Sequence, residues 1–391
     1  MKRVINLSVP NLDVEPILSN LRECIESGWV STGGRFITEF ENKIAVYTKS
    51  KKAVGVQSGT AGLHLALDVL GVKSEDEVLV PTLTFIAAVN PVTYVGATPV
   101  FIGCDDSLCI DPNLLEKFLK EECFIKNGVT YNKKTLKRIP ALILVHVFGN
   151  MADMEKIMDI ASRFNSKVIE DSTEALGTYY TSGKYVGKYA GTIGDIGIYS
   201  FNANKIITTG GGGMVLAKDE KILDRIRSLS TQAKKDDLYF IHDEIGYNYR
   251  MLNLQAALGT TQIDGLEKFI ETKTKNYMRY KEAISKIDGL TLLDFNSNTR
   301  PNYWFYSIVV DEKRYGMNKD DLLKALVSEG IQTRPIWGLI HEQKPYLKNE
   351  TYGSEKAIWY HDRVLNIPCS SNLGDDEVQT VIDVLKSLKK K

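Results

Sequence analysis

Long apolar runs are scarce in this chain of 391 residues. The longest lies at about 141–147, within IPALILVHVFG, and is far shorter than the roughly 20 residues that a membrane-spanning helix requires. The first residues, MKRVINLSVPNLDVEP, are not followed by the long apolar segment that a secretory signal contains. We therefore expect neither a transmembrane helix nor a signal peptide, and a cytoplasmic location is the default expectation.

The chain also lacks an excess of charge of either sign and has few cysteines. Its 49 lysines and arginines balance 49 aspartates and glutamates, so the net charge gives no sign of the phosphate attraction on which nucleic-acid binding rests. We do not expect nucleic acid as a partner. The cysteines are odd in number, scattered and never spaced as C-x-x-C, so we expect reduced thiols and no metal site. They are Cys24, Cys104, Cys109, Cys123 and Cys369.

From about residue 50, short apolar runs alternate with segments of helical periodicity. This alternation is typical of a largely parallel sheet covered by helices on both faces, so we predict an α/β fold. Two later runs, 195–201 and 212–219, are too close for a helical crossover and are predicted to pair antiparallel. The strands predicted in the alternating part are 51–56, 77–81, 98–104, 141–149 and 167–172.

The length of the chain suits one large and one small domain. We expect an N-terminal arm at 1–35, a large domain at 36–251, and a connector helix with a small C-terminal α/β domain at 252–391. Within the large domain, Asn127-Gly128 between alternating apolar residues predicts a hairpin over 123–135. In the small domain we expect a strand at 302–311, a helix at 318–330, a strand at 331–336 and a closing helix at 375–390.

Lys205 stands between an apolar run and four glycines in SFNANKIITTGGGGMV. A phosphate-loop lysine requires its glycines before it, in the pattern G-x-x-x-x-G-K-[ST], whereas here they follow. This order excludes the nucleoside-triphosphatase motif. The dinucleotide fingerprint G-x-G-x-x-G is absent as well, because GVQSGTAGLH has the wrong spacing.

Two other segments have features of a ligand site. In QSGTAGLHLAL (57–67) a strand ends in small residues and a helix begins, so free N–H groups could face a phosphate. The alternative is an ordinary helix cap by Ser58 or Thr60. In VIEDSTEALG (168–177), Glu170 and Asp171 end a buried strand, where ligands bind in open α/β sheets. Asp171 either caps the following segment or bonds a cationic ring nitrogen.

Together, the phosphate cradle, Asp171 and Lys205 predict a pyridoxal 5′-phosphate enzyme. Such an enzyme needs a lysine for a Schiff base, an acid that keeps the pyridine nitrogen protonated, and backbone donors for the phosphate. Lys205 is then the Schiff-base lysine.

The motifs quoted above, with PTLTFIAAVNPVTYVGATPVF, VHVFGN and IGYNYRMLNLQAALG, resemble the DegT/DnrJ/EryC1/StrS sugar aminotransferases over nearly the whole chain. The resemblance implies the aspartate aminotransferase fold, fold type I of these enzymes, with a mostly parallel seven-stranded sheet. It also implies a homodimer with shared active sites. Its substrates would be a nucleotide-linked keto-sugar and L-glutamate, used in a ping-pong reaction through pyridoxamine phosphate.

The resemblance also implies roles for individual residues. Lys205 would be catalytic, and Asp171 would hold the ring nitrogen. Glu174, where many family members carry Gln, would lie near the cofactor's phenolic oxygen. The remaining cofactor contacts would be Gly59, Thr60, Ala61 and Ser200 at the phosphate, Phe85 stacked on the ring, and Asn248 from the neighbouring subunit.

For the sugar substrate, the resemblance points to GWVSTGG (28–34), to Arg250 and to RPIWGLIHEQKPY (334–346). Core packing is an equal alternative for Trp337, and a structural role is the alternative for His341, as it is for His146. The substrate-binding candidates are Ser31, Thr32, Arg250, Trp337 and His341.

The hairpin and the glutamate of EDSTEALG most resemble the subgroup that acts on nucleotide-linked 4-keto-6-deoxy-N-acetylhexosamines, of the bacillosamine or legionaminic acid type. The expected reaction is amine transfer to C4 of the sugar. The alternatives are a transaminase that makes perosamine or a 3-amino sugar, and a non-catalytic protein that binds sugar or cofactor.

Overall fold

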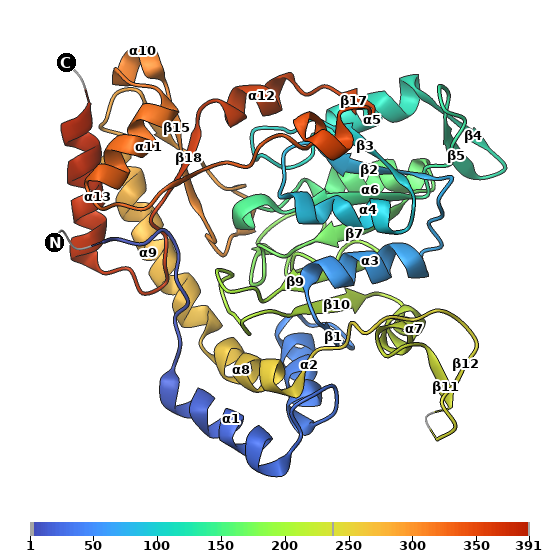
Figure 1. The fold of residues 1–391 in the computed structure, drawn as a ribbon. Helices are drawn as coiled ribbons and strands as arrows, with labels where there is room; N and C mark the ends of the chain where they lie inside the picture. Colours follow the sequence, from blue (N-terminus) through green and yellow to red (C-terminus); the bar gives the residue numbers. More distant parts are fainter. Residues whose placement is uncertain (1–3, 237, 390–391) are drawn as a thin grey trace.

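The structure, a computed structural model, describes residues 4–236 and 238–389 (Figure 1). Among these residues, eight strands form a large sheet in the order β1-β10-β9-β7-β6-β2-β3-β17. β10 pairs antiparallel with both neighbours and the other described pairs are parallel, which confirms the predicted sheet and its antiparallel pair. The strands are β1 (Val54–Val56), β2 (Glu77–Pro81), β3 (Thr98–Ile102), β6 (Ala141–Val145), β7 (Lys167–Asp171), β9 (Ile196–Ser200), β10 (Gly213–Ala217) and β17 (Thr351–Tyr352).

The large sheet has one strand more than the seven expected. The additional strand, β17, pairs in parallel with β3 at the edge of the sheet, although it comes from the last part of the chain. It comprises two residues. A strand of this length is too short to show an alternating pattern, so no sequence signal predicts it.

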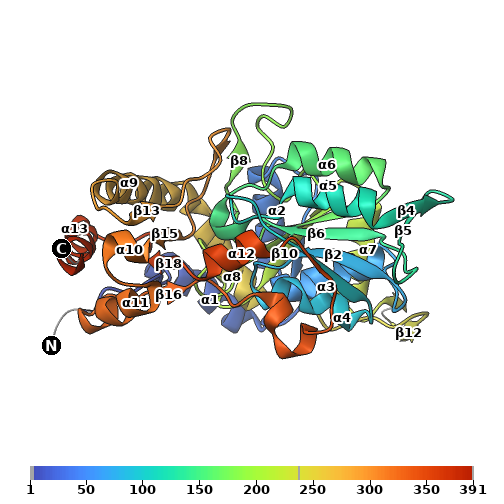
Figure 2. The ribbon, with the colours of Figure 1, turned by 90° about the horizontal axis from the view of Figure 1, so that it is seen from above.

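Helices cover both faces of the large sheet, as Figure 2 shows from above. Along β10, Val215 packs in a cluster with α3 and α7, whereas Met214 and Leu216 pack in another with α2 and α8, because successive strand residues point to opposite faces. α5 and α6 lie on the face opposite α3 and α4. These helices are α2 (Arg35–Tyr47), α3 (Gly59–Val69), α4 (Asn90–Tyr94), α5 (Pro112–Glu121), α6 (Met154–Arg163), α7 (Glu220–Ser230) and α8 (Asn253–Asp264).

The predicted hairpin is present as β4 (Cys123–Lys126) and β5 (Val129–Asn132), which pair antiparallel. Its two turn residues, Asn127 and Gly128, have φ of 52° and 75°, as a tight primed turn requires. This confirms the prediction from the Asn-Gly dipeptide.

A second, antiparallel sheet of four described strands has the order β13-β15-β18-β16 and packs against α9 and α11, and α13 packs against these two helices. The strand expected at 302–311 begins only at Tyr306, since Tyr303 has φ of 53°, outside the strand region. The strand expected at 331–336 is limited to β16. The elements are β13 (Leu290–Leu292), β15 (Tyr306–Val310), β16 (Arg334–Pro335), β18 (Val364–Ile367), α9 (Leu266–Ile284), α11 (Lys319–Ser328) and α13 (Asp375–Leu388).

The N-terminal segment runs along this small sheet before α1. Ile5 forms a parallel bridge with Ile331, and α1 packs against α8.

Among the described residues, no helix is both long and apolar enough to cross a lipid bilayer. The division of the chain at residues 35 and 251 stays a prediction. The remaining elements are α1 (Val14–Ser27), α10 (Glu312–Tyr315), α12 (Glu355–His361), and the strand pairs β8 (Tyr179–Tyr180) with β14 (Thr299–Arg300) and β11 (Lys234–Asp236) with β12 (Ile241–His242).

Candidate active site

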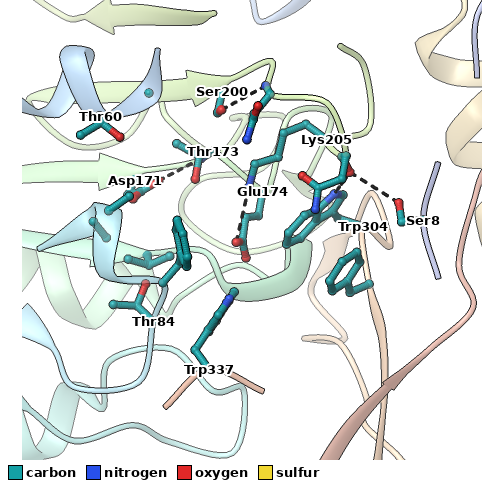
Figure 3. Close-up of a pocket in the computed structure, with 18 of the residues that line it drawn as sticks. Ser8, Thr60, Thr84, Asp171, Thr173, Glu174, Ser200, Lys205, Trp304 and Trp337 are labelled. Carbon is teal, nitrogen blue, oxygen red and sulfur yellow. Dashed lines mark hydrogen bonds and ion pairs between the residues drawn. The ribbon is translucent and has the colours of Figure 1, made fainter. Parts of the chain in front are cut away.

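A cavity of about 800 Å³ lies between the large sheet and the small sheet (Figure 3). On one side, Asp171 ends β7, Ser200 ends β9 and Gly59 begins α3. Carboxyl ends of parallel strands meet at one edge of a sheet, so the fold brings these residues together. Lys205 enters from the loop between β9 and β10, and residues of β16 and β18 close the other side.

The glycine run after Lys205 lets the chain turn back beside the cavity. Gly210 and Gly212 have φ of 78° and 144°, which residues with a side chain rarely adopt. At Gly213 a Cβ would lie 2.7 Å from the carbonyl carbon of Ser58. Only glycine therefore allows β10 to pass so close to the start of α3.

The ammonium of Lys205 lies between a carboxylate and an aromatic ring. Its Nζ is 3.5 Å from Oε1 of Glu174 and 4.0 Å from the centroid of the Trp304 ring, and the side chain is 13% exposed (Figure 3). The indole N–H of Trp304 donates to the carbonyl oxygen of Asn204 at 2.8 Å, which fixes the ring beside the lysine. A cation packed on an aromatic face gains further when it is desolvated.

Glu174 is a buried acid whose charge depends on pH near neutrality. Its Oε2 accepts a hydrogen bond from the N–H of Phe148 at 2.8 Å. Burial raises the pKa of Glu174 to about 7, although the nearby Lys205 works against this increase. The carboxyl group is therefore close to the point at which it gains or loses its proton.

Asp171 is buried in the floor of the cavity, and its Oδ1 accepts a hydrogen bond from the N–H of Thr173 at 3.0 Å. Burial raises its pKa, with the bond to Thr173 opposing the shift. Among the described residues, Asp171 forms no ion pair. A protonated ring nitrogen would supply the missing positive charge, so Asp171 fits the pyridine ring of pyridoxal phosphate.

The start of α3 fits a phosphate group. Ser58 caps the helix, since its Oγ accepts a hydrogen bond from the N–H of Ala61 at 3.0 Å. The N–H groups of Gly59 and Thr60, in the first turn, have no partner within the helix. A Cβ on Gly59 would lie 2.9 Å from Cγ2 of Thr173, so the cradle has room for backbone alone. Ser58 can therefore cap the helix while the N–H groups of Gly59 and Thr60 face an anion. The N–H of Ala61 already donates to Ser58, so it is not free for that anion.

Of the other predicted residues, Phe85 and Trp337 line the cavity. Phe85 is 54% exposed, while Trp337 packs against Phe148 with ring centroids 4.8 Å apart. Both rings are thus in a position to contact a ligand.

The structure does not bring the remaining candidates to the cavity of this chain. Arg250 is buried in an ion pair with Glu41 at 2.5 Å and donates to the carbonyl oxygen of Gly55, so its place here is structural. His341 hydrogen-bonds to Thr82 through Nδ1. The candidates that lie on the exposed surface are Ser31, Thr32 and Asn248.

His146 proves to be a structural histidine beneath the site. Its Nε2 lies 2.9 Å from Oε2 of Glu170, and its Nδ1 accepts from the N–H of Ala152. Burial opposes the charge of Glu170, but His146 and the N–H groups of Gly191 and Gly194 hold the pKa of Glu170 below its usual range. This network fixes the end of β7, next to Asp171.

Sequence reasoning missed several residues of the cavity wall. Trp304 and Phe305 stack on each other with centroids 4.0 Å apart, within a stretch that the pattern assigned to a strand. Arg334 and Asn366 also line the cavity. For Trp304 and Phe305 the one available signal was the aromatic run NYWFY, which apolar alternation explains equally well. Arg334 is the first residue of RPIWGLIHEQKPY, the segment expected to contact the sugar, but it was not singled out there.

Comparisons with known proteins show the family of the chain. The model of the DegT/DnrJ/EryC1/StrS aminotransferase family matches residues 12–386. The chain is 35% identical over 374 residues to the putative pyridoxal phosphate-dependent aminotransferase EpsN of Bacillus subtilis (94% of this chain, 92% of the relative). It is 36% identical over 362 residues to GDP-perosamine synthase of Escherichia coli O157:H7 (92% and 91%).

Among solved structures, DesI, determined in the presence of its TDP-sugar product, is similar with a TM-score of 0.87 and 26% identity. The similarity covers 99% of this chain and 93% of that one. The family model and the relatives extend over nearly the whole chain, and the cavity fits the cofactor that the family uses. The chain therefore belongs to the DegT/DnrJ/EryC1/StrS aminotransferase family, whose members are pyridoxal-phosphate-dependent sugar aminotransferases of fold type I.

Proposed function

We propose that this protein transfers an amino group from L-glutamate to C4 of a nucleotide-linked 4-keto-6-deoxyhexose. The observation that carries the proposal is the placement of Lys205 in one cavity with a buried Asp171, which has no ion-pair partner among the described residues, and with the backbone of the first turn of α3. A protein that only bound a sugar would need neither a lysine nor an acid at these places.

The relatives support a perosamine-type sugar substrate over an N-acetylhexosamine. Three of them are GDP-perosamine synthases, at 36%, 33% and 33% identity. Their names favour a perosamine-type substrate over the N-acetylhexosamine suggested by the hairpin and by Glu174. We therefore propose a GDP-linked sugar without an N-acetyl group as the first substrate to test.

Pyridoxal phosphate, when bound, takes up the amino group of the donor and passes it to the ketone. Asp171 would accept a hydrogen bond from the ring nitrogen, and the N–H groups of Gly59 and Thr60 with the hydroxyl of Ser200 would hold the phosphate. Phe85 would cover the ring. Lys205 would form the covalent bond to the cofactor and, once released, would move a proton at the reacting carbon of each substrate.

Glu174 and Trp304 would direct the amine of Lys205 during these proton transfers, because they contact it from two sides. We also expect a homodimer, in which Ser31, Thr32 and Asn248 of one subunit would face the cavity of the other. These three residues are exposed, as such a role requires.

The test begins with the purified protein and added pyridoxal phosphate. A yellow protein, in which borohydride fixes the cofactor on the peptide that contains Lys205, supports the assignment. Lys205→Ala should abolish this labelling, whereas Lys218→Ala, at an exposed position beyond β10, should leave it intact. A colourless protein, or labelling that persists in Lys205→Ala, contradicts the proposal.

The substrates are tested separately. L-Glutamate alone should bleach the yellow colour, and a keto-sugar should restore it. Comparing GDP-, UDP- and dTDP-linked 4-keto-6-deoxy sugars, with and without an N-acetyl group, identifies the nucleotide and the sugar. If glutamate never bleaches the colour, the donor assignment fails while the cofactor assignment stands.

A further inference from the structure

Gln262 is a buried side chain to which the proposed function gives no role. It lies on α8 and is 2% exposed. Burying an amide is costly unless its polar atoms are hydrogen-bonded, and here both have a partner. Its Oε1 accepts from the N–H of Thr208 at 3.2 Å, and its Nε2 donates to the carbonyl oxygen of Asn11 at 2.9 Å. Gln262 therefore joins α8 to two segments that lie 54 and 251 positions away in the sequence.

Thr208 belongs to the loop that carries Lys205. The carbonyl oxygen of Phe201 accepts from the N–H of Thr209 at 2.9 Å and from the hydroxyl of Thr208 at 3.1 Å, so these bonds close the base of the loop. Residues 202–204, which precede Lys205, are exposed. The bond between Thr208 and Gln262 ties the base of this partly exposed loop to a helix.

The helix that carries Gln262 is itself held firmly in the large domain. α8 packs against α1 and α2. Asn20 of α1 donates to the carbonyl oxygen of Ala257 at 3.1 Å, and Asn253, the first residue of α8, accepts from the N–H of Phe36 at 3.1 Å. A loop bonded to α8 is thereby fixed relative to the large sheet.

The second partner, Asn11, lies in the N-terminal segment, which passes along the other side of the loop. The hydroxyl of Ser8 in this segment lies 3.5 Å from the carbonyl oxygen of Asn204 (Figure 3). Between the segment and the loop is a cavity of about 10 Å³, about the smallest volume that holds one water molecule. The segment and the loop are therefore closely packed, and Gln262 bonds to both.

These contacts matter because Lys205 has to reach both the cofactor and the reacting carbon. Glu174 and Trp304 contact the end of its side chain, but the point from which the side chain starts is set by the loop. A shift of about 1 Å in a reacting group can slow a reaction by about 100-fold. The main chain of Lys205 therefore needs a support of its own.

We propose that Gln262 is a positioning residue, which fixes the loop of Lys205 between α8 and the N-terminal segment. This inference rests on the proposed role of Lys205 in the proposed function. Loss of the two bonds of Gln262 should loosen the loop and slow the proton transfers of Lys205. It should leave the binding of the amino donor unchanged.

The first measurement uses the full chain before the cofactor is added. Gln262→Met removes both hydrogen bonds at nearly constant volume. In hydrogen exchange followed by mass spectrometry, peptides from 202–209 should exchange about tenfold faster in this variant, while those of α7 should exchange as in the wild type. Gln379→Met, the same change at an exposed position of α13, is the matched control and should equal the wild type. Unchanged exchange in the loop overturns the inference. Equal acceleration in the loop and in α7 also overturns it, because it shows a general loss of stability.

The second measurement uses the holoenzyme and follows bleaching by L-glutamate. The maximal rate should fall about tenfold in Gln262→Met, whereas the glutamate concentration that gives half of this rate should stay the same. An unchanged maximal rate, or a change confined to the half-maximal concentration, overturns the inference.

A conservative variant and an independent outcome complete the test. Gln262→Glu keeps an acceptor for the N–H of Thr208, so it should stay within about threefold of the wild type in both measurements. A defect as large as that of Gln262→Met would overturn the inference. If glutamate does not bleach the wild type, the proposed donor is wrong, and hydrogen exchange in the cofactor-free chain still decides whether Gln262 holds the loop.

Discussion

Replacing Glu174 by Gln should remove a pH dependence from the stability of the cofactor-free protein. Burial raises the pKa of Glu174 from 4.5 to about 7 in the folded chain. In the unfolded chain the carboxyl group loses its proton near its ordinary pKa of 4.5. At pH values between 4.5 and about 7, Glu174 is therefore protonated in the folded state and ionised in the unfolded state. The contribution of Glu174 to the free energy of unfolding should therefore decrease as the pH rises from 4.5 to about 7.

The size of this effect follows from the same two values. At about 1.4 kcal/mol per pH unit, the interval from 4.5 to about 7 corresponds to about 3 kcal/mol. Gln cannot ionise, but its side-chain oxygen can still accept the hydrogen bond from Phe148. The difference in unfolding free energy, Glu174→Gln minus wild type, should thus increase by about 3 kcal/mol across the interval and stay constant above it.

Urea unfolding of both proteins after removal of the cofactor, at several pH values from about 4.5 to about 8, measures this difference. Glu26→Gln, at an exposed position of α1, is a control that should follow the wild type at every pH. Parallel curves for Glu174→Gln and the wild type would refute the reasoning. They would show that the ammonium of Lys205, 3.5 Å away, outweighs the effect of burial and keeps Glu174 ionised throughout.

Three further substitutions test other parts of the structure. Gly59→Ala places a methyl group 2.9 Å from Cγ2 of Thr173, so the affinity for pyridoxal phosphate, measured by titration of its absorbance, should fall at least about tenfold; unchanged affinity would place the phosphate elsewhere. Trp304→Phe keeps an aromatic ring but removes the indole hydrogen bond, so the rate of bleaching by glutamate should fall about fivefold without a change in the unfolding midpoint; equal rates would show that the ring does not position Lys205. Asp76→Asn weakens a buried pair of charge-assisted bonds to Arg138 and should cost about 2 kcal/mol in urea unfolding, whereas a loss below about 0.5 kcal/mol would contradict a structural role for the pair.

Local chemistry explains why parts of the fold could be predicted. The Asn127-Gly128 turn was visible because two neighbouring residues with positive φ are enough to specify it. The caps at Ser58 and Asn318 follow from residues within a few positions of the helix start. β17 had no such signal, because a strand of two residues depends on its partner at the sheet edge and not on its own pattern.

The residues of the cavity also divide into those with a local sequence signal and those that depend on contacts distant in the sequence. Arg250 was a candidate because the family resemblance points to it, yet in this chain its side chain is buried against Glu41, 209 positions away in the sequence. Trp304 was overlooked because an aromatic residue in an apolar run predicts core packing. Only the positive φ at Tyr303 and the bond from the indole to Asn204 direct its ring toward Lys205.

The sequence by itself determined the α/β class and the antiparallel position of β10, and it singled out Lys205 and Asp171 as the proposed reactive lysine and its acid, since each depends on periodicity or on a contiguous motif. The tertiary structure alone decided which side chains share the cavity. Arg334 begins the segment RPIWGLIHEQKPY and Asn366 lies 32 positions later, as their numbers show, but only the antiparallel pairing of β16 and β18 sets them side by side. Burial likewise decided the charge of Glu174, because the pKa of a carboxyl group is set by the neighbours and the solvent that folding gives it or takes away.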